Sequence, residues 1–409
     1  MIVHTLKGNS YSYLRSANEI VAGEVQDDLL PIQFCAWHPI TEFPELQTFT
    51  LSITTKCNFR CVYCCYSGNY RNVRSHGETS MSLRDFDRIL DFIEVNARVK
   101  PIVISFYGGE SLLEYSFIFG CINKARGRWG SDVRFEVSTN GYLLSESYVD
   151  WFCKKEVTLF ISLDGGPKIQ DRQRKTATGK PSFARIKNIL EYISKRYPDY
   201  LQQHVLLLMT VLRLDELPVI AEEWQNDLLL RGIPPARISS VAPNYGQGVE
   251  ALSYEKELPA FLNMLDVFER HPEYVVLQVF FERWLAEWIE RPVFEINEPQ
   301  EVPTCMPHNR KLYIDTNYEL SVCEKVPDVF RFGSLEKGID WEAVNEMACK
   351  TYKTITGRCA QCPVARLCDV CPAILDLSED EMDLYCHNKL VMQQVKFRIF
   401  CEMAERGLI

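Results

Sequence analysis

The sequence predicts an α/β fold in which the strands of a parallel sheet alternate with helices. Six short apolar runs, rich in β-branched residues, are separated by stretches with helical periodicity. Several of these runs are apolar almost throughout, as strands buried on both faces are. Alternation repeated this often implies a parallel sheet, either open or curled into a barrel. The predicted strands are 48–55, 101–107, 132–138, 157–163, 204–212 and 236–243.

The clearest helical pattern follows the first predicted strand, at residues 82–96. Its apolar side chains recur at spacings of three and four residues, which places them on one face of a helix. Ser82 followed by Asp85 fits an N-cap with an acidic residue in the first turn. In α/β folds ligands bind where the parallel strands end. We therefore expect functional residues just after the predicted strands.

The composition is that of an ordinary globular protein of 409 residues, 46% of them hydrophobic and 24% charged. A net charge of −10 disfavours binding to nucleic acid or to an anionic membrane through the overall field. No apolar run approaches the roughly 20 residues that span a bilayer, and the N-terminus lacks the apolar core of a signal peptide. We expect a cytoplasmic protein, in which sixteen cysteines indicate metal or redox chemistry rather than disulfides.

The chain divides into four predicted parts. Residues 1–47 are too few for a full domain and could form a small, truncated hairpin for peptide recognition. Residues 48–245 hold the strands, and residues 246–303 form a helical bridge. Residues 304–409 form a small cysteine-rich domain that ends in a helix. The bridge carries an aromatic face that is expected to pack: Phe280, Phe281, Trp284 and Trp288.

Three cysteines with a distinctive spacing follow the first strand. The pattern Cys57-x3-Cys61-x2-Cys64 can hold three irons of a four-iron, four-sulfur cluster and leave the fourth iron open for catalysis. A zinc site would need a fourth Cys or His nearby. Cys65 is adjacent, but consecutive side chains diverge and would strain to bind one ion. Incidental buried cysteines are the remaining alternative.

The spacing resembles the signature of radical S-adenosylmethionine (SAM) enzymes, in which an aromatic residue such as Tyr63 commonly precedes the third cysteine. The stretch "YGGES" resembles the family's Gly-Gly-Glu-Pro turn, with Gly108, Gly109 and Glu110 in the matching places. Ser111 replaces the proline. The resemblance implies that the glycines allow close backbone approach and that Glu110 pairs with the ammonium group of SAM.

Two further stretches agree with the family order, at the ends of the next two strands. "STNG" supplies Ser138 and Asn140, and "SLDG" supplies Ser162 and Asp164. The serines are expected to contact the ribose or adenine side of SAM. Downstream, Asp171-x-x-Arg174 would place a guanidinium that can clamp a carboxylate with two hydrogen bonds. The family usually has His before this Asp, where this chain has Gln170.

The resemblance implies a partial (β/α)6 barrel that resembles a TIM barrel and holds SAM at the strand ends. A cluster on the three cysteines would pass an electron to SAM, and the resulting 5′-deoxyadenosyl radical would abstract hydrogen from an unactivated carbon. A reductant such as flavodoxin or ferredoxin is the implied partner.

A second group of cysteines lies after residue 304. Two Cys-x2-Cys pairs, Cys359/Cys362 and Cys368/Cys371, could bind one tetrahedral zinc, although zinc ribbons usually separate their pairs by about 15–20 residues. Zinc alone would also leave three cysteines of this region unused: Cys305, Cys323 and Cys386.

This group resembles the SPASM extension of many radical SAM enzymes, which holds two auxiliary iron–sulfur clusters and makes three [4Fe–4S] clusters in all. The resemblance assigns one auxiliary cluster to Cys359, Cys362, Cys368 and Cys386. It assigns the other to Cys305, Cys323 and Cys371, where three thiolates stand in for the four of a closed site. Either Cys349 supplies the fourth ligand, or one iron of this cluster stays open to a substrate thiolate or water.

Two features depart from the extension's pattern. The last internal spacing is Cys-x2-Cys rather than Cys-x3-Cys, and a glycine is replaced within "KLYIDTNYELSVC". We expect a hairpin turn at Thr316-Asn317, because Asn tolerates positive φ better than other non-Gly residues. Three cysteines outside both groups lie on helical patterns and are expected in the core: Cys121, Cys153 and Cys401.

Proteins with this pair of domains mostly modify peptides. The resemblance therefore implies maturation of a ribosomally made precursor peptide, with a thioether from cysteine to carbon as the leading product. A carbon–carbon cross-link, epimerisation and sulfatase maturation are the alternatives. A zinc-stabilised interaction protein without enzymatic activity is a hypothesis from another class, and it predicts colourless protein that does not respond to SAM.

Overall fold

A computed structural model of the chain describes every residue except 28–29, 72, 242–247, 295–297, 306–309 and 327–328. Its centre is a ten-stranded sheet in the order β11-β10-β8-β7-β6-β4-β12-β13-β14-β15. From β11 to β12 every neighbouring pair is parallel. All six predicted strands are confirmed, as β4 (Thr48–Thr54), β6 (Ile102–Gly108), β7 (Val133–Thr139), β8 (Thr158–Ser162), β10 (Val205–Val211) and β11 (Arg237–Ser240).

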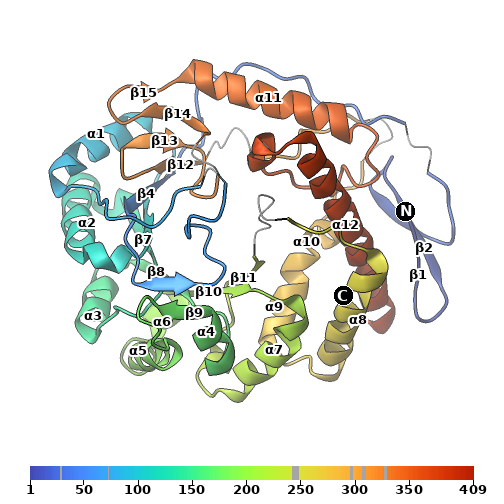
Figure 1. Ribbon diagram of the computed structural model, residues 1–409, viewed down its shortest axis with the longest axis horizontal. Coiled ribbons are helices and arrows are strands. Elements are labelled where there is room, and N and C mark those ends of the chain that lie inside the picture. The colour runs from blue at the N-terminus through green and yellow to red at the C-terminus, as the bar shows by residue number, and fades with distance from the viewer. Residues whose placement is uncertain (28–29, 72, 242–247, 295–297, 306–309, 327–328) are drawn as a thin grey trace.

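The parallel strands form an open barrel with helices on the outside (Figure 1). The outward side chains of β7, namely Val133, Phe135 and Val137, are buried, whereas the intervening Glu136 and Ser138 remain partly exposed. The same alternation occurs in β8 and β10, whereas consecutive residues of β4 are buried on both faces, so the expectation of strands buried on both faces is confirmed for β4 and wrong for β7, β8 and β10. The outer helices are α1 (Phe86–Asn96), α2 (Tyr115–Trp129), α3 (Glu146–Lys154), α5 (Phe183–Arg196), α6 (Pro198–His204) and α7 (Leu217–Asn226).

The predicted helix at 82–96 begins as a short 3₁₀ turn (Leu83–Asp85) and continues as α1. The Ser82 hydroxyl accepts a hydrogen bond from the Arg84 backbone N–H, as an N-cap residue does. The apolar stripe of α1 is buried against the sheet, at Phe86, Ile89, Leu90 and Ile93. The periodicity in the sequence therefore predicted both the helix and the face it buries.

The cysteine-rich region continues the barrel sheet. Strand β12 (Lys311–Ile314) lies parallel to β4, with Tyr313 opposite Thr50. An antiparallel meander follows, formed by β13 (Glu319–Ser321), β14 (Arg331–Ser334) and β15 (Gly338–Ile339). Helix α11 (Trp341–Cys359), a 3₁₀ turn (Pro372–Asp376) and the long helix α12 (Glu379–Arg406) complete the region.

The predicted hairpin at Thr316-Asn317 is present between β12 and β13, but the positive φ belongs to Tyr318, at 64°. The expectation that Asn317 takes this conformation is wrong. The carboxylate of Asp315 accepts hydrogen bonds from the backbone N–H groups of Asn317 (2.7 Å) and Glu319 (2.9 Å). These two bonds hold the chain on both sides of Tyr318, whose hydroxyl also donates to Asp85. Tertiary contacts therefore stabilise a conformation that a tyrosine rarely adopts.

The bridge consists of α8 (Tyr254–Arg270), α9 (Val275–Trp284) and α10 (Ala286–Ile289). Its predicted aromatic packing face is confirmed, because Phe280, Phe281 and Trp288 are buried and Trp284 stacks on Phe261 at 4.3 Å between ring centroids. Within the described residues, no helix has the length and apolar character that crossing a membrane requires.

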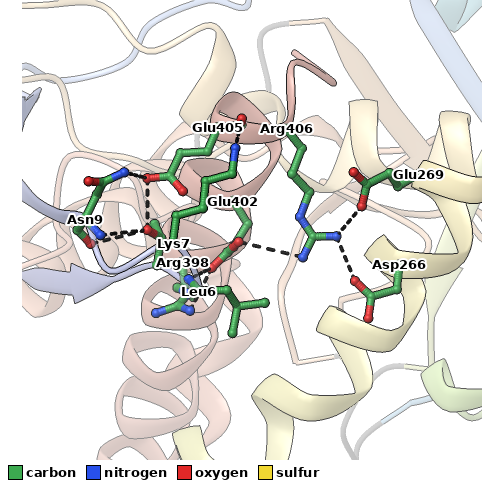
Figure 2. Close-up of polar contacts among 10 residues, drawn as sticks. Leu6, Lys7, Asn9, Asp266, Glu269, Arg398, Glu402, Glu405 and Arg406 are labelled. Carbon is green, nitrogen blue, oxygen red and sulfur yellow. Dashed lines mark hydrogen bonds and ion pairs between the residues drawn. The ribbon is translucent and has the colours of Figure 1, made fainter.

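The N-terminal segment forms a three-stranded antiparallel sheet of β1 (Ile2–His4), β2 (Ser10–Leu14) and β3 (Glu19–Ala22), larger than the predicted hairpin. Figure 2 shows how it is attached to the end of α12. The Leu6 backbone N–H donates to Glu402 (2.6 Å), whose carboxylate also pairs with Arg398 (2.7 Å). Arg406 links the same helix to α8 through Asp266 and Glu269, both at 2.7 Å.

Candidate active site

The cysteine triplet lies on a loop that begins where β4 ends. Cys61 closes the short strand β5 (Phe59–Cys61), which pairs with β9 (Arg174–Thr176) so that Cys61 lies opposite Arg174. The pKa of the Cys57 thiol is raised to about 12, chiefly by burial, with smaller contributions from Glu110, Cys61 and Cys64. Burial also raises the pKa of Cys61 and Cys64. The structure therefore brings the three predicted ligands together.

The donor set consists of cysteine thiols, the ligands that iron–sulfur clusters use, so its chemistry fits such a cluster. Among the described residues, no three cysteine, histidine or carboxylate side chains are grouped as ligands of one metal ion. Thiols with raised pKa values ionise when they bind metal, because the metal charge offsets the cost of burial.

Gly108 and Gly109 bring the end of β6 against the start of the cysteine loop. The backbone N–H of Gly109 donates to Thr54 (2.9 Å), and that of Glu110 donates to Lys56 (2.8 Å). A Cβ on Gly108 would lie 2.4 Å from the Thr54 carbonyl oxygen, and one on Gly109 would lie 2.0 Å from that of Lys56. Gly108 also has a φ of 150°, so only glycine fits both requirements.

Glu110 is fully buried and joins the ends of β6 and β7. Its carboxylate accepts hydrogen bonds from the Thr139 hydroxyl (2.5 Å) and from the backbone N–H groups of Asn140 (2.7 Å) and Leu112 (3.1 Å). Burial raises the pKa of Glu110, and these donors oppose the rise. The carboxylate positions the strand ends, a role the sequence did not suggest. Pairing with a ligand ammonium stays a prediction.

Arg174 is buried beside the cysteine loop, at the end of α4 (Pro167–Gln173). Its Nη1 donates to the Tyr63 hydroxyl at 2.7 Å, and Tyr63 donates in turn to the buried Asp164. Among the described residues, the buried Nε atom of Arg174 has no hydrogen-bond partner, and neither has either side-chain polar atom of Gln173. Unpaired buried donors are costly, so these atoms indicate a bound polar ligand. The guanidinium therefore keeps a free donor, and its predicted pairing with a carboxylate stays a prediction.

The other predicted SAM contacts divide into two kinds. Ser138 and Ser162 are half-buried, and of the described residues none bonds to their hydroxyls, which leaves both free for a ligand. Asn140 is instead bonded to Asn58 of the cysteine loop, with Nδ2 donating at 2.8 Å. Asp164 accepts from the Thr210 backbone N–H at 3.0 Å, in addition to Tyr63. Asn140 and Asp164 therefore position the site.

The departure at Gln170 has a structural explanation. The Gln170 side chain accepts from the Asp164 backbone N–H (2.9 Å) and donates to the Ser182 hydroxyl (3.2 Å). Asp171 caps the start of α5 by accepting from the backbone of Ser182 and Phe183. The two residues link the end of β8 to α5, so they act on the fold and not on a ligand.

The four cysteines of the first auxiliary set lie near one another, and their role as cluster ligands stays a prediction. Cys359 ends α11, Cys362 and Cys368 follow in the next turns, and Cys386 lies on α12. The pKa of Cys359 is raised to about 12, chiefly by burial, with contributions from Cys362, Cys368 and Cys386. The pKa of Cys368 is also raised to about 12 by burial, with contributions from Cys362 and Cys386 that Lys389 opposes. These four thiols form one group, with Ile355, Val370 and Ile374 packed beside it.

The second set is only partly assembled. Burial raises the pKa of Cys305, and the neighbouring Cys371 adds to the effect. The pKa of Cys323 is raised to about 12, chiefly by burial; the Glu324 charge also raises it and the Lys311 charge lowers it. Lys311 lowers the pKa of Cys305 as well. Cys305 and Cys323 thus both lie near Lys311 of β12, and Cys371 lies near Cys305.

Cys349 lies on the face of α11 that contacts the N-terminal segment. Four residues before it, Asn345 bonds to the backbone of Ile40, and three residues after it, Tyr352 donates to the Cys35 carbonyl. A role for Cys349 as a fourth cluster ligand stays a prediction. The expected core cysteines are confirmed, since Cys121 and Cys401 are buried and Cys153 packs against the core.

Two residues near the cysteine loop carried no signal in the sequence. His76 places Nε2 3.6 Å from the Cys64 sulfur, and it lines a cavity of about 300 Å³ with Cys57, Lys56 and Arg60. Arg74 reaches into the barrel. Both lie in an irregular segment with no periodic pattern, so only the folded chain shows what they face.

Residues 51–222 match the family model described as the radical SAM superfamily. Among curated proteins, the serine-type anaerobic sulfatase-maturating enzyme of Bacteroides thetaiotaomicron is 24% identical over 142 residues, which are 34% of each chain. The cysteine-type enzyme of Clostridium novyi is 29% identical over 154 residues, 36% of this chain and 40% of the relative. The alignments thus span about a third to two fifths of these relatives.

Solved structures match over most of the chain. The structure of histidine-tagged anSMEcpe with bound AdoMet has a TM-score of 0.65 at 18% identity, covering 90% of this chain and 96% of that one. Streptococcus suis SuiB bound to its precursor peptide SuiA has a TM-score of 0.53 at 12% identity, covering 83% of this chain and 74% of SuiB. At these identities the likeness shows the fold, a partial barrel with a C-terminal region.

Proposed function

The chain belongs to the radical SAM superfamily through residues 51–222, and from this premise we propose that it is a radical SAM enzyme that matures a ribosomally made precursor peptide. The leading reaction is a thioether cross-link from a cysteine sulfur to a carbon of the same peptide. Forming that bond removes one hydrogen from carbon and one from the thiol, so the peptide loses two electrons and two protons. One electron would leave with the hydrogen atom taken by the 5′-deoxyadenosyl radical, the thiol proton would go to solvent, and an auxiliary cluster is the proposed acceptor of the other electron.

One observation carries the proposal: the buried, incompletely paired Arg174 beside the cysteine triplet. Its Nε lacks a partner among the described residues, and Tyr63 and Asp164 fix its position. A guanidinium in that state suits the carboxylate of an amino-acid ligand such as SAM. Ser138 and Ser162 offer free hydroxyls on neighbouring strands of the same barrel.

The chain's own residues would hold, orient and shield the reactants. Cys57, Cys61 and Cys64 would ligate the SAM-binding cluster, and Gly109 and Glu110 would fix the loop against β6. Phe59, buried and in edge contact with Tyr142 at 5.6 Å, would exclude water from one side. When bound, SAM and the cluster supply the one-electron chemistry that removes hydrogen from an unactivated carbon.

Two auxiliary clusters would complete the electron path. Cys359, Cys362, Cys368 and Cys386 offer four thiolates for one of them. Cys305, Cys323 and Cys371, with Cys349 as a candidate fourth ligand, would hold the other. An open iron there could bind the peptide thiolate before the cross-link forms. A reductant such as flavodoxin or ferredoxin would deliver the first electron.

Iron and acid-labile sulfide on anaerobically reconstituted protein test the cofactors. Three four-iron clusters predict about 12 irons per chain, and about 8 after Cys57, Cys61 and Cys64 are all changed to Ala. Cys368→Ala should also lose iron, whereas the matched core variant Cys121→Ala should keep about 12. Zinc in place of iron would instead support a structural, non-enzymatic protein. Release of 5′-deoxyadenosine on reduction then tests SAM cleavage.

The peptide reaction needs its own test. The enzyme is co-expressed with short cysteine-containing reading frames found beside its gene, and the products are analysed by mass spectrometry. We expect a peptide lighter by two hydrogens, with one cysteine that no longer reacts with an alkylating agent. A mass loss with all cysteines still reactive would favour a carbon–carbon bond. No mass loss but deuterium uptake from heavy water would favour epimerisation.

Sulfatase maturation is a second candidate. The observation that favours it is the fold match to anSMEcpe over 96% of that chain, together with two curated sulfatase-maturating relatives. It predicts that a peptide carrying a sulfatase active-site Cys or Ser is oxidised to an aldehyde. Incubation of the reduced enzyme with such a peptide, followed by trapping with a hydrazine, separates the two candidates.

A further inference from the structure

A charged side chain reaches the inner face of the barrel without an ionic partner among the described residues. Arg74 lies on the segment that follows the cysteine loop, and its Nη1 donates to Ser52 of β4 and to the Tyr313 hydroxyl of β12. Its guanidinium carbon lies 3.9 Å from the ring centroid of Tyr66 and 5.4 Å from those of Tyr107 and Tyr313. Three strands and one loop therefore enclose a single cation.

The guanidinium is incompletely paired. Although Arg74 as a whole is partly exposed, its Nη2 atom is buried and has no hydrogen-bond partner in the part of the chain that the structure describes. No carboxylate of the described residues forms an ion pair with it, unlike the neighbouring Arg71, which pairs with Glu381 at 2.5 Å. Buried cations are normally paired, because leaving water costs several kcal/mol. Aromatic faces offset only a part of that cost.

Tyrosine hydroxyl groups surround the Arg74 guanidinium, and no carboxylate of the described residues pairs with it. Tyr66 donates to the Glu324 carbonyl at 3.0 Å and contacts the Tyr107 hydroxyl at 3.2 Å. A carboxylate that reaches Nη2 of Arg74 would meet a donor without a partner among the described residues.

The position suits a substrate rather than SAM. Tyr66 lies two residues after Cys64, and Tyr107 directly precedes Gly108, so the cage adjoins both predicted SAM motifs. The hydrogen bond from Tyr66 to the backbone carbonyl of Glu324 joins the cage to the residue that follows Cys323. Arg74 and the tyrosines around it thus lie between the cysteine triplet and the loop that carries Cys323. A substrate that binds between the two predicted cluster regions would contact them.

We propose that the Arg74 cage, formed by Arg74, Tyr66, Tyr107, Tyr313 and Ser52, binds a carboxylate of the substrate. The group is either an Asp or Glu side chain or the free C-terminus of a peptide, bound to Nη2 of Arg74. This inference rests on the proposed function and deepens it, because it names the chemical group by which the peptide is held while the reacting carbon faces SAM.

Three small probes distinguish the two sources of the carboxylate. N-acetyl-L-glutamic acid α-amide carries a side-chain carboxylate, N-acetyl-L-glutamine carries a terminal one, and N-acetyl-L-glutamine amide carries none. Their dissociation constants are measured by ligand-observed NMR on the reconstituted enzyme with SAM present. We expect one of the acids to bind at least about tenfold more tightly than the neutral amide, as a charge-assisted hydrogen bond provides.

The variants assign the binding to the cage. Arg74→Gln should bring the acid and the amide to within about twofold of each other. The matched control Arg71→Gln removes a guanidinium from the same segment and should keep the preference. Should Arg74→Gln fail to retain iron, Arg74→Lys replaces it, and we expect a preference weakened by about threefold or more, because an ammonium lacks the paired donors.

Three results would overturn the inference: equal binding of acids and amide, no saturable binding of either acid, or an undiminished preference in the Arg74 variants. Iron content and SAM binding are measured on the same samples. Acid-selective binding by a protein without iron would overturn the proposed function alone. A SAM-binding, iron-loaded enzyme without acid preference would overturn only the role of Arg74.

Discussion

Arg174 donates a 2.7 Å hydrogen bond from Nη1 to the hydroxyl of Tyr63, the residue between two predicted cluster ligands. Tyr63 donates onward to Asp164, at the end of β8. These two hydrogen bonds connect β9, the cysteine loop and the end of β8 in one buried relay. This relay fixes the guanidinium whose Nε remains free for a ligand.

Tyr63→Phe tests that relay. Without the hydroxyl, Nη1 of Arg174 loses its partner and the guanidinium loses its fixed position, so we expect the dissociation constant for SAM to rise about tenfold. Iron content should not change, because no cysteine is altered. Equilibrium dialysis with labelled SAM measures the effect. Tyr192→Phe, which removes an exposed hydroxyl bonded to Asp150 at 2.6 Å, is the control. Equal SAM affinity in both variants would show that the Tyr63 hydroxyl does not position Arg174 for SAM.

Gly109→Ala should disconnect the cysteine loop from β6. The new methyl group would fall 2.0 Å from the Lys56 carbonyl oxygen, a backbone atom that cannot rotate away. We expect loss of about four irons and of SAM binding.

Gly127→Ala is the matched control, because it lies in α2 with nothing within 4 Å of the added carbon. It should keep all iron and gain about 0.5–1 kcal/mol of stability. Full iron content in Gly109→Ala would refute the prediction.

Glu402→Gln should loosen the N-terminal sheet. Glu402 is 1% exposed and bonds to Leu6, Arg398 and Arg406, so losing its charge leaves the buried guanidinium of Arg398 without an ion pair among the described residues. We expect a loss of about 3 kcal/mol in the free energy of unfolding and a thermal midpoint lower by roughly 3 °C. Limited proteolysis should cut within the first 24 residues. Asp132→Asn, which breaks the exposed pair with Lys100, should change neither measurement.

The N-terminus of α12 should stabilise the fold in a pH-dependent way. Hydrogen bonding from Arg71, and then from the Ser378 backbone, lowers the pKa of Glu381 to about 2. A carboxylate whose pKa is lower in the folded state contributes stability above its unfolded pKa, near 4.5, and this contribution is lost as the pH falls towards 2.

The comparison of wild type with Glu381→Gln checks this. The difference in thermal midpoint should stay constant from neutral pH down to about 5 and shrink at lower pH. Asp380→Asn, in the same helical turn, serves as the control for an added neutral residue. A difference that is as large at pH 3.5 as at pH 7 would show that ionisation of Glu381 is not its cause.

Local patterns in the sequence predicted much of this fold. The six barrel strands and α1 follow from apolar periodicity and from the turn residues between elements, which act over a few positions. The ligand spacing in the cysteine triplet is equally local. Tyr318 could not be foreseen, because its positive φ depends on Asp315 and Asp85, and the second of these lies over 200 residues away in the chain.

The strand–helix alternation and the cysteine triplet follow from short-range spacing in the sequence, whereas the set Cys359, Cys362, Cys368 and Cys386 was implied only by the family resemblance. Folding brings β12 beside β4 and Tyr63 against Arg174. It also brings Arg74 against β4, β6 and β12. Burial and pairing of a charge depend on which distant strands meet, and no local pattern encodes that meeting.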